Sequence, residues 1–263
     1  MRRAILLLIA SLMILSACNK DEFQTSFETP SKLLVSVSEN DQLITEFKYD
    51  NSDRLIQADR YLPGDPVCIS QFFEYNSGNL IIRKSYGEYI ETYEYNNNGR
   101  MVAMILHFKS DRDGFEWEQK TEFQYSNGRI SKGIKYSREG IESGYIEYKY
   151  DSRGNTTQRT EYSDLPDSKG MIMSQYKYTY DDKINPYYFS GTPFWTVHQA
   201  DIVQGNNPVY SHYYNISMSA FPPEYEFTYE YDLTGLPIKG TMKHLTINGS
   251  TTIFEYKYID RNN

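Results

Sequence analysis

The chain has 263 residues, a formal net charge of −8, and 26 tyrosines against only 2 tryptophans. The acidic balance argues against nucleic-acid binding, which depends on lysine and arginine side chains that neutralise phosphates.

The first residues have the pattern of a signal peptide that ends at a cysteine. Arg2 and Arg3 are basic, residues 4–15 form an apolar run too short for a membrane span, and small residues lead into Cys18. This segment resembles the lipobox of bacterial lipoproteins. The resemblance implies removal of residues 1–17 and acylation of Cys18. An ordinary secretory signal with a stray thiol is the alternative.

Residues 18–30 are predicted to be a tether. Its start, Asn19-Lys20-Asp21-Glu22, resembles the surface-export tag of Bacteroidetes lipoproteins. That implies a lipid-anchored protein of the outer membrane, exposed at the cell surface, with a periplasm-facing position left open. An acylated Cys18 would leave Cys68 without a disulfide partner. Because Cys68 lies between Val67 and Ile69, we expect a small buried side chain.

Residues 31–263 are predicted to form one repetitive β domain, with a first strand at Lys32 to Ser38. Pairs of aromatic residues recur along it, and the two members of each pair are separated by one polar residue. In a strand this spacing places the rings on one face and the polar groups on the other. The pairs are Phe47/Tyr49, Phe73/Tyr75, Tyr93/Tyr95, Phe123/Tyr125, Tyr148/Tyr150, Tyr178/Tyr180, Tyr229/Tyr231 and Tyr256/Tyr258.

Most pairs are followed by a turn rich in Asn, Asp and Gly, such as Asn96-Asn97-Asn98-Gly99. Asn and Asp initiate turns, and Gly accepts the positive φ that they require. The fold class is therefore all-β, a repetitive antiparallel hairpin meander of about sixteen strands, in a strongly curved or barrel-like sheet. A membrane-spanning barrel is the competing architecture, disfavoured by charges on both strand faces at Arg83 and Lys84.

One interval breaks the rhythm, because Tyr180 and Tyr231 are 51 residues apart (231 − 180). Pro186, Pro193 and Pro208 disfavour regular strands there. Residues 182–208 are predicted to be an ordered insertion that packs over the sheet or plugs one end, with a short helical turn around Phe194 and regular pairing resuming at Val209.

Two resemblances follow from these repeats. The stretches Tyr49 to Leu55 and Tyr95 to Met101 resemble the tyrosine–aspartate repeats of the Rhs type. The run from Tyr180 to Tyr187, with Asn206-Asn207 and Tyr231 to Pro237 downstream, resembles Bacteroidetes lipoproteins of an uncharacterised domain family with a porin-like fold. The latter resemblance implies a fold and a location, and no known activity.

The sequence offers few catalytic or metal-binding groups. The four histidines, His107, His198, His212 and His244, lack the spacing of a metal site. Residues 111–114 match part of a calcium loop, although a plain hairpin turn is favoured. Glu116, Glu118 and Glu122 share one strand face opposite Trp117, a composition also found in glycosidases. We expect no metal and no cofactor.

The aromatic residues of the insertion are the better candidates for ligand contact, since Tyr and Trp combine flat apolar area with a polar group. They are Tyr187, Tyr188, Phe189, Phe194 and Trp195. The leading hypothesis is a non-catalytic envelope lipoprotein that binds or scaffolds a glycan or protein partner and is held to the membrane by its lipid. A glycoside hydrolase or other carbohydrate-active enzyme, and a structural envelope protein without ligand, are the alternatives.

Overall fold

The computed structural model describes residues 32–62, 68–109, 116–187, 205–216, 222–246 and 249–261, without the side chains of residues 109 and 117. This part of the chain is built from strands joined by short turns and one 3-10 turn, η1 (Pro166–Ser168). The strands are β1 (Lys32–Glu39), β2 (Gln42–Tyr49), β3 (Leu55–Tyr61), β4 (Cys68–Tyr75), β5 (Ile81–Tyr86), β6 (Tyr89–Tyr95), β7 (Met101–Lys109), β8 (Glu116–Ser126), β9 (Arg129–Ser137), β10 (Glu142–Tyr150), β11 (Thr156–Ser163), β12 (Ile172–Ile184), β13 (Asn206–Asn215), β14 (Glu224–Tyr231), β15 (Pro237–His244) and β16 (Thr251–Asp260).

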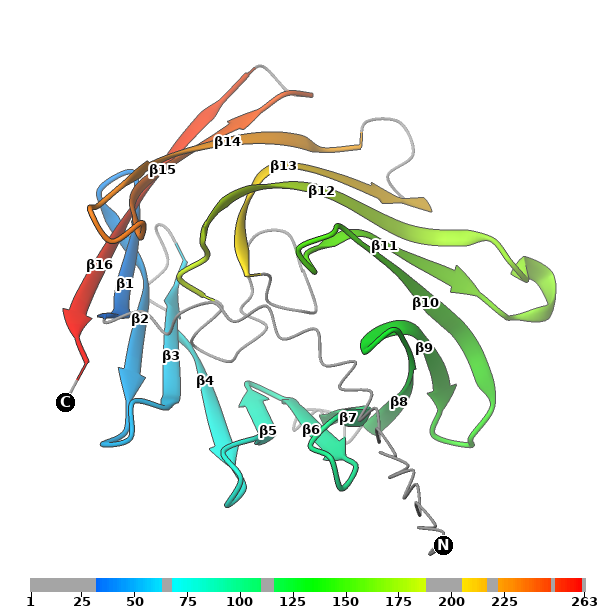
Figure 1. Ribbon diagram of the computed structural model, residues 1–263. Helices are drawn as coiled ribbons and strands as arrows, with labels where there is room; N and C mark the ends of the chain where they lie inside the picture. Colours follow the sequence, from blue (N-terminus) through cyan, green and yellow to red (C-terminus); the bar gives the residue numbers. More distant parts are fainter. Residues whose placement is uncertain are drawn as a thin grey trace, which may run out of the picture.

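The strands close into an antiparallel barrel in which each pairs with its neighbours in the sequence (Figure 1). Closure is made by β1 and β16, whose register runs from Lys32 opposite Asp260 to Glu39 opposite Phe254. Closure removes both free edges, which an open sheet of this width would leave exposed. The prediction of an all-β, barrel-like meander of about sixteen strands is confirmed.

The predicted sorting of rings and polar groups between the two faces is also found. In β10, Ile146 and Tyr148 are buried, whereas Glu147, which lies between them, and Lys149, which follows them, are exposed. In β16 exposure alternates in the same way along the strand. The buried, aromatic face lines the inside of the barrel, and the polar face forms its outer wall.

The largest apolar cluster lies inside the barrel at β1 to β4. Its buried members are Leu34, Val37, Phe47, Leu55, Ala58 and Phe73. Tyr187, which follows β12, packs against this cluster. Its ring lies 6.2 Å from that of Phe47 on β2 and 6.4 Å from that of Tyr256 on β16. None of β2, β16 and β12 is a neighbour of another in the sheet, so these contacts are made across the interior.

A β-bulge recurs at the start of the return strand of seven hairpins in the described chain. In the first, Lys48 lies opposite Gln57 and Tyr49 lies opposite Leu55, so Ile56 is an extra residue. The same register shift follows Glu74, Glu94, Gln124, Lys149, Thr179 and Glu230. Each bulge increases the local twist and helps the sheet to curl.

The two ends of the barrel differ. One end, the Asx rim, carries the turns at residues 50–54, 76–80, 96–100, 126–129, 151–155 and 232–236, the β12–β13 connection, and the outer ends of β1 and β16. The other end, the far rim, carries the remaining turns. Helices with the length and hydropathy of a membrane span are absent from the described residues.

Three sequence predictions differ from the structure. Cys68 is exposed at the start of β4, so the prediction of a buried thiol is wrong. It lies at a strand end on the far rim, where neighbouring strands do not cover it. Regular pairing resumes at Asn206 rather than Val209, and β1 continues to Glu39. Residues 1–31, with the predicted signal peptide, tether and Cys18, lie outside the described chain.

Candidate functional site

A ring of tyrosines encircles the Asx rim from the inside. In the described chain, eight tyrosine hydroxyls each donate to a backbone carbonyl on the preceding strand at 2.6–2.9 Å. The donor and acceptor pairs are Tyr49 and Leu34, Tyr75 and Leu55, Tyr95 and Ile81, Tyr125 and Met101, Tyr150 and Ile130, Tyr180 and Thr156, Tyr229 and Pro208, and Tyr258 and Pro237.

These bonds satisfy carbonyls that the ladders do not reach. Between β3 and β4 the described pairing ends at Gln57 and Phe72, two residues before Leu55. The Tyr75 hydroxyl then supplies the donor that Leu55 lacks in the ladder. Burial raises the pKa of Tyr75 to about 12, so the phenol is neutral and able to donate at physiological pH. The ring is therefore a structural device that joins adjacent hairpins.

Five turns of the Asx rim share one geometry. In the turn at Asn96, the side-chain Oδ1 accepts the backbone N–H of Asn98 and of Arg100. Gly99, the fourth residue, has a φ of 73°, a region that favours glycine. Asp50, Asn76, Asp151 and Asp232 accept the same two backbone bonds. These residues define each turn because an Asx side chain caps its own loop.

Asp181 begins a sixth turn of this type, which the β12–β13 connection interrupts. Its Oδ1 accepts the N–H of Lys183 at 2.9 Å, as in the other turns. The second bond comes from the N–H of Asn207 at 3.2 Å. Asn207 lies 26 residues after Asp181 (207 − 181), against 4 in an ordinary turn. The connection is thus 22 residues inserted into one Asx turn, which Asn207 still closes.

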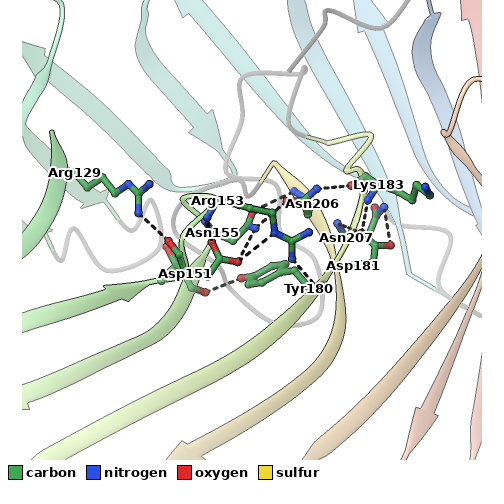
Figure 2. A network of polar contacts seen from close by, with 10 residues as sticks. Arg129, Asp151, Arg153, Asn155, Tyr180, Asp181, Lys183, Asn206 and Asn207 are labelled. Atoms are coloured by element: carbon green, nitrogen blue, oxygen red, sulfur yellow. Dashed lines mark hydrogen bonds and ion pairs between the residues drawn. The ribbon is translucent and has the colours of Figure 1, made fainter. Parts of the chain in front are cut away.

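Two further asparagines hold the ends of the connection (Figure 2). Asn155 Nδ2 donates to Asn206 Oδ1 at 2.8 Å, and the Asn206 N–H donates to Asn155 Oδ1 at 3.2 Å. Asn206 Nδ2 donates to the carbonyl of Lys183, and Asn207 Nδ2 to that of Ile184. Asn155, Asn206 and Asn207 are at most 2% exposed. We call Asp181, Asn155, Asn206 and Asn207 the clamp.

The clamp is tied to both neighbouring repeats. On one side Asn155 Nδ2 also donates to Asp151, and Arg129 donates to the carbonyl of Asp151 at 3.0 Å (Figure 2). On the other side the Tyr231 hydroxyl donates to Asp181 Oδ2. Burial, and then this bond to Asp181, raise the pKa of Tyr231. A buried polar network whose members are paired fixes one backbone arrangement.

A second polar cluster lies inside the barrel on β5 and β6. Lys84 Nζ is 2.7 Å from Glu91 Oε2, and both side chains are at most 10% exposed. Glu91 also accepts the hydroxyls of Tyr86 at 3.2 Å and Tyr93 at 2.5 Å. The carboxylate is thus surrounded by three donors. The ammonium of Lys84 and the two hydroxyls stabilise the buried carboxylate of Glu91. Both oxygens of this carboxylate already accept bonds from protein donors.

The predicted ligand-contact residues are only partly placed. Tyr187 is half-buried and packs on the interior cluster, and burial raises the pKa of its phenol well above the usual value. Its N–H is held by Asn185 Oδ1 at 3.0 Å. Tyr188, Phe189, Phe194 and Trp195 lie outside the described residues, as does the predicted helical turn. Their role stays a prediction.

The candidate catalytic acids lie on the outer wall. Glu118 Oε2 is 3.0 Å from Nδ1 of His107, its cross-strand partner. Glu122 Oε1 is 2.9 Å from Lys120 Nζ. His212 lies on β13, 3.9 Å from Glu224. Residues 110–115, with the partial calcium motif, and His198 fall outside the described chain. Within the described residues, three or more His, Cys, Asp or Glu side chains never gather as a metal site would need.

Sequence reasoning missed the clamp and the Lys84–Glu91 pair. A signal for the pair was present, because Glu91 has the same parity as Tyr93 and Tyr95 and so belongs to their buried face. The clamp gave a weaker signal. Asn206 and Asn207 come directly before Pro208, in the place where the last residues of a turn come before a return strand. Asp181, which begins their turn, lies 22 residues further from Asn207 than in an ordinary turn, so no local pattern links them.

Comparison with known proteins supports the fold. No protein-family profile matches the chain, and no curated protein matches it. The barrel is similar to the crystal structure of a porin-like protein from Bacteroides uniformis, with 12% identity, a TM-score of 0.52, and 87% of this chain and 96% of that chain covered. A porin-like protein from Bacteroides vulgatus gives 12% identity, a TM-score of 0.49, and coverage of 87% and 99%. At this identity the likeness to the first protein shows a shared porin-like fold.

Proposed function

We propose that the chain is a lipid-anchored envelope protein whose barrel presents the β12–β13 connection as a non-catalytic binding segment for a glycan or protein partner. The observation that carries this proposal is the clamp. Asp181 and three buried asparagines hold both ends of a single long connection, where the five Asx turns of the same rim need five residues each. Long loops held by a rigid scaffold are where proteins place binding groups.

The composition of the connection favours ligand contact over plain linkage. Residues 188–204 include Tyr188, Phe189, Phe194 and Trp195. Such side chains suit the faces of sugar rings and the apolar patches of protein surfaces. The acids weighed for glycoside hydrolysis instead pair with His107 and Lys120 on the outer wall, which supports a binding role over a catalytic one.

The outer wall supports a barrel that is tethered rather than embedded. Cross-strand ion pairs lie on it, among them Glu74 with Arg83 and Glu230 with Lys239. A lipid-facing wall would instead carry a continuous apolar band. Attachment would then come from acylated Cys18. The finer assignment to Bacteroidetes lipoproteins, and the position on the outer membrane, belong to this proposal.

Binding is tested with purified protein against immobilised envelope glycans and defined envelope proteins. Trp195→Ala and Tyr188→Ala should each weaken binding by about tenfold or more, as expected for aromatic anchors. The matched control is Phe72→Ala, because Phe72 is 49% exposed on the outer wall. Full affinity in both connection variants, or a loss shared by the control, would contradict the proposal. Turnover of a polysaccharide that one carboxylate substitution abolishes would replace it with an enzyme.

Anchoring is tested separately by metabolic labelling with an alkyne fatty acid. Label should enter the chain and disappear in Cys18→Ala. A chain that is secreted unlabelled, with Cys18 retained as a thiol, would contradict the anchored part of the proposal and leave the binding part standing.

A further inference from the structure

The chain enters and leaves the barrel at the same rim. β1 starts at Lys32 and β16 ends at Asp260, and these two residues lie opposite each other at the Asx rim. Lys32 Nζ is also 2.8 Å from Asp232 Oδ2 in the β14–β15 turn, which ties the first described residue to that rim. Cys18 precedes Lys32 by 14 residues (32 − 18). Fully extended, such a tether spans at most about 50 Å, so a lipid on Cys18 would be attached to the barrel at the Asx rim and lie within that distance of Lys32.

Charge is unevenly divided between the two rims of the described chain. The far rim has nine acidic residues against three basic ones, a net charge of −6: Glu39, Asp41, Glu88, Glu116, Glu139, Glu142, Asp164, Asp167 and Glu224 against Lys109, Arg138 and Lys169. The Asx rim is balanced, with seven of each: Asp50, Asp53, Asp151, Asp181, Asp182, Asp232 and Asp260 against Lys32, Arg54, Arg100, Arg129, Arg153, Lys183 and Arg261. An anionic lipid surface therefore repels the far rim and tolerates the Asx rim.

Exposed apolar side chains lie beside the start of β1 on the Asx rim. Leu233 at the tip of the β14–β15 turn is fully exposed, and Ile238 and Ile259 are 44% and 50% exposed. They sit on β15, β16 and the turn between β14 and β15, and β16 is the neighbour of β1. Apolar side chains in such a position can enter the boundary between headgroups and acyl chains.

The far rim also exposes apolar residues, among them Leu43, Leu62 and Leu245. Four more, Ile141, Leu165, Met171 and Ile172, lie in or beside two neighbouring turns. Glu139, Glu142, Asp164 and Asp167 stand among them in the same turns. Entry of this surface into lipid would bring carboxylates close to anionic headgroups, which repel them. The apolar residues of the far rim are therefore less suited to enter a membrane than those of the Asx rim.

We propose that the Asx rim is a lipid-facing surface, resting on the membrane through Leu233, Ile238 and Ile259, with the acidic far rim turned away. This inference rests on the proposed anchoring at Cys18. It also deepens the proposed function, because the β12–β13 connection leaves from the same rim. The ligand of the connection is then a glycan or protein at the lipid surface.

The test uses the full acylated chain in vesicles of phosphatidylethanolamine and phosphatidylglycerol that contain brominated lipid. Cys68→Ser removes the exposed native thiol, and one environment-sensitive fluorophore is then placed at Leu233→Cys, Ile238→Cys or Ile259→Cys. The matched controls are Ile141→Cys and Leu165→Cys on the far rim, which are also apolar and exposed. Bromine should reduce the emission of the Asx-rim labels about twofold and leave the far-rim labels unchanged, because this quencher acts only at close range within the acyl region.

Flotation of each labelled protein with the vesicles separates the two ways of failing. Protein that floats while its Asx-rim labels stay unquenched, or while the far-rim labels are quenched instead, overturns the orientation and leaves the anchoring intact. Protein that does not float overturns the anchoring and the orientation together.

Discussion

The hydroxyl of Tyr125 on β8 donates to the backbone carbonyl of Met101 on β7 at 2.6 Å. The described ladder between these strands begins two residues further on, at Ala103 and Glu122. Tyr125→Phe removes the donor and leaves the carbonyl half-buried without its partner. We expect a loss of about 1–3 kcal/mol in the free energy of unfolding, measured by urea denaturation.

A matched control distinguishes this bond from a general effect of losing a hydroxyl. Tyr214 lies on the outer wall and its hydroxyl is not part of the tyrosine ring. Tyr214→Phe should change stability by less than about 0.5 kcal/mol, as is usual for surface positions. Equal losses in both variants would show that the ring bonds add nothing specific.

The tyrosine ring also predicts an unusual alkaline titration. Burial raises the pKa of Tyr75 and of Tyr150 to about 12, from a usual value of 10.0. The fold favours the neutral phenol, so its contribution to stability is complete below pH 10 and is lost as the pH rises towards 12. Tyrosinate absorbance should therefore appear in two phases in the native protein and in one phase near pH 10 in denaturant. A single native phase near pH 10 would contradict the buried ring.

The Lys84–Glu91 pair predicts an asymmetry between single and double substitution. Glu91→Gln leaves a buried ammonium without its counter-charge and should cost about 3–5 kcal/mol. Replacing both residues, as Lys84→Met with Glu91→Leu, should recover most of that loss. The exposed pair Glu74 and Arg83 is the control, since Glu74→Gln should cost at most about 1 kcal/mol. A double variant that is no more stable than Glu91→Gln would show that the unpaired ammonium is not the cause of the loss in stability.

The clamp predicts that one isosteric change releases the connection. Asn207→Asp replaces the amide that donates to Asp181 and Ile184 with a second carboxylate. We expect a loss of about 2–3 kcal/mol and faster proteolytic cleavage between residues 188 and 204. Asn98→Asp, in an exposed turn of the same rim, is the control and should leave both unchanged. Unchanged cleavage in Asn207→Asp would show that the clamp does not hold the connection.

Local pattern predicted the strands and their faces because both depend on neighbours in the sequence. The spacing of Tyr93 and Tyr95, with Glu94 between them, indicates a two-residue period and nothing about closure. Closure depends on Lys32 meeting Asp260, a pairing of residues at opposite ends of the domain that no local pattern specifies. The sequence therefore left a curved sheet and a barrel as equal outcomes.

The finer features of the site depend on register. A bulge shifts pairing by one residue, and the tyrosine ring depends on where the neighbouring ladder ends, as at Gln57 and Phe72, two residues before Leu55. Composition cannot show that Tyr75 meets Leu55, or that Asn207 completes a turn begun by Asp181. The prediction that Cys68 is buried was wrong for a related reason, because its apolar neighbours in the sequence are not its neighbours in the sheet.

The pairing of β1 with β16 has a consequence for how the barrel can be rebuilt. The strands form a circle, and each of the eight tyrosine bonds joins two neighbouring strands that a far-rim turn connects, as Tyr49 on β2 is bonded to Leu34 on β1. Residues 32 and 260 are adjacent, so a short linker can join them and new termini can be cut in any far-rim turn. A circular permutant opened between β9 and β10 should therefore keep the whole ring.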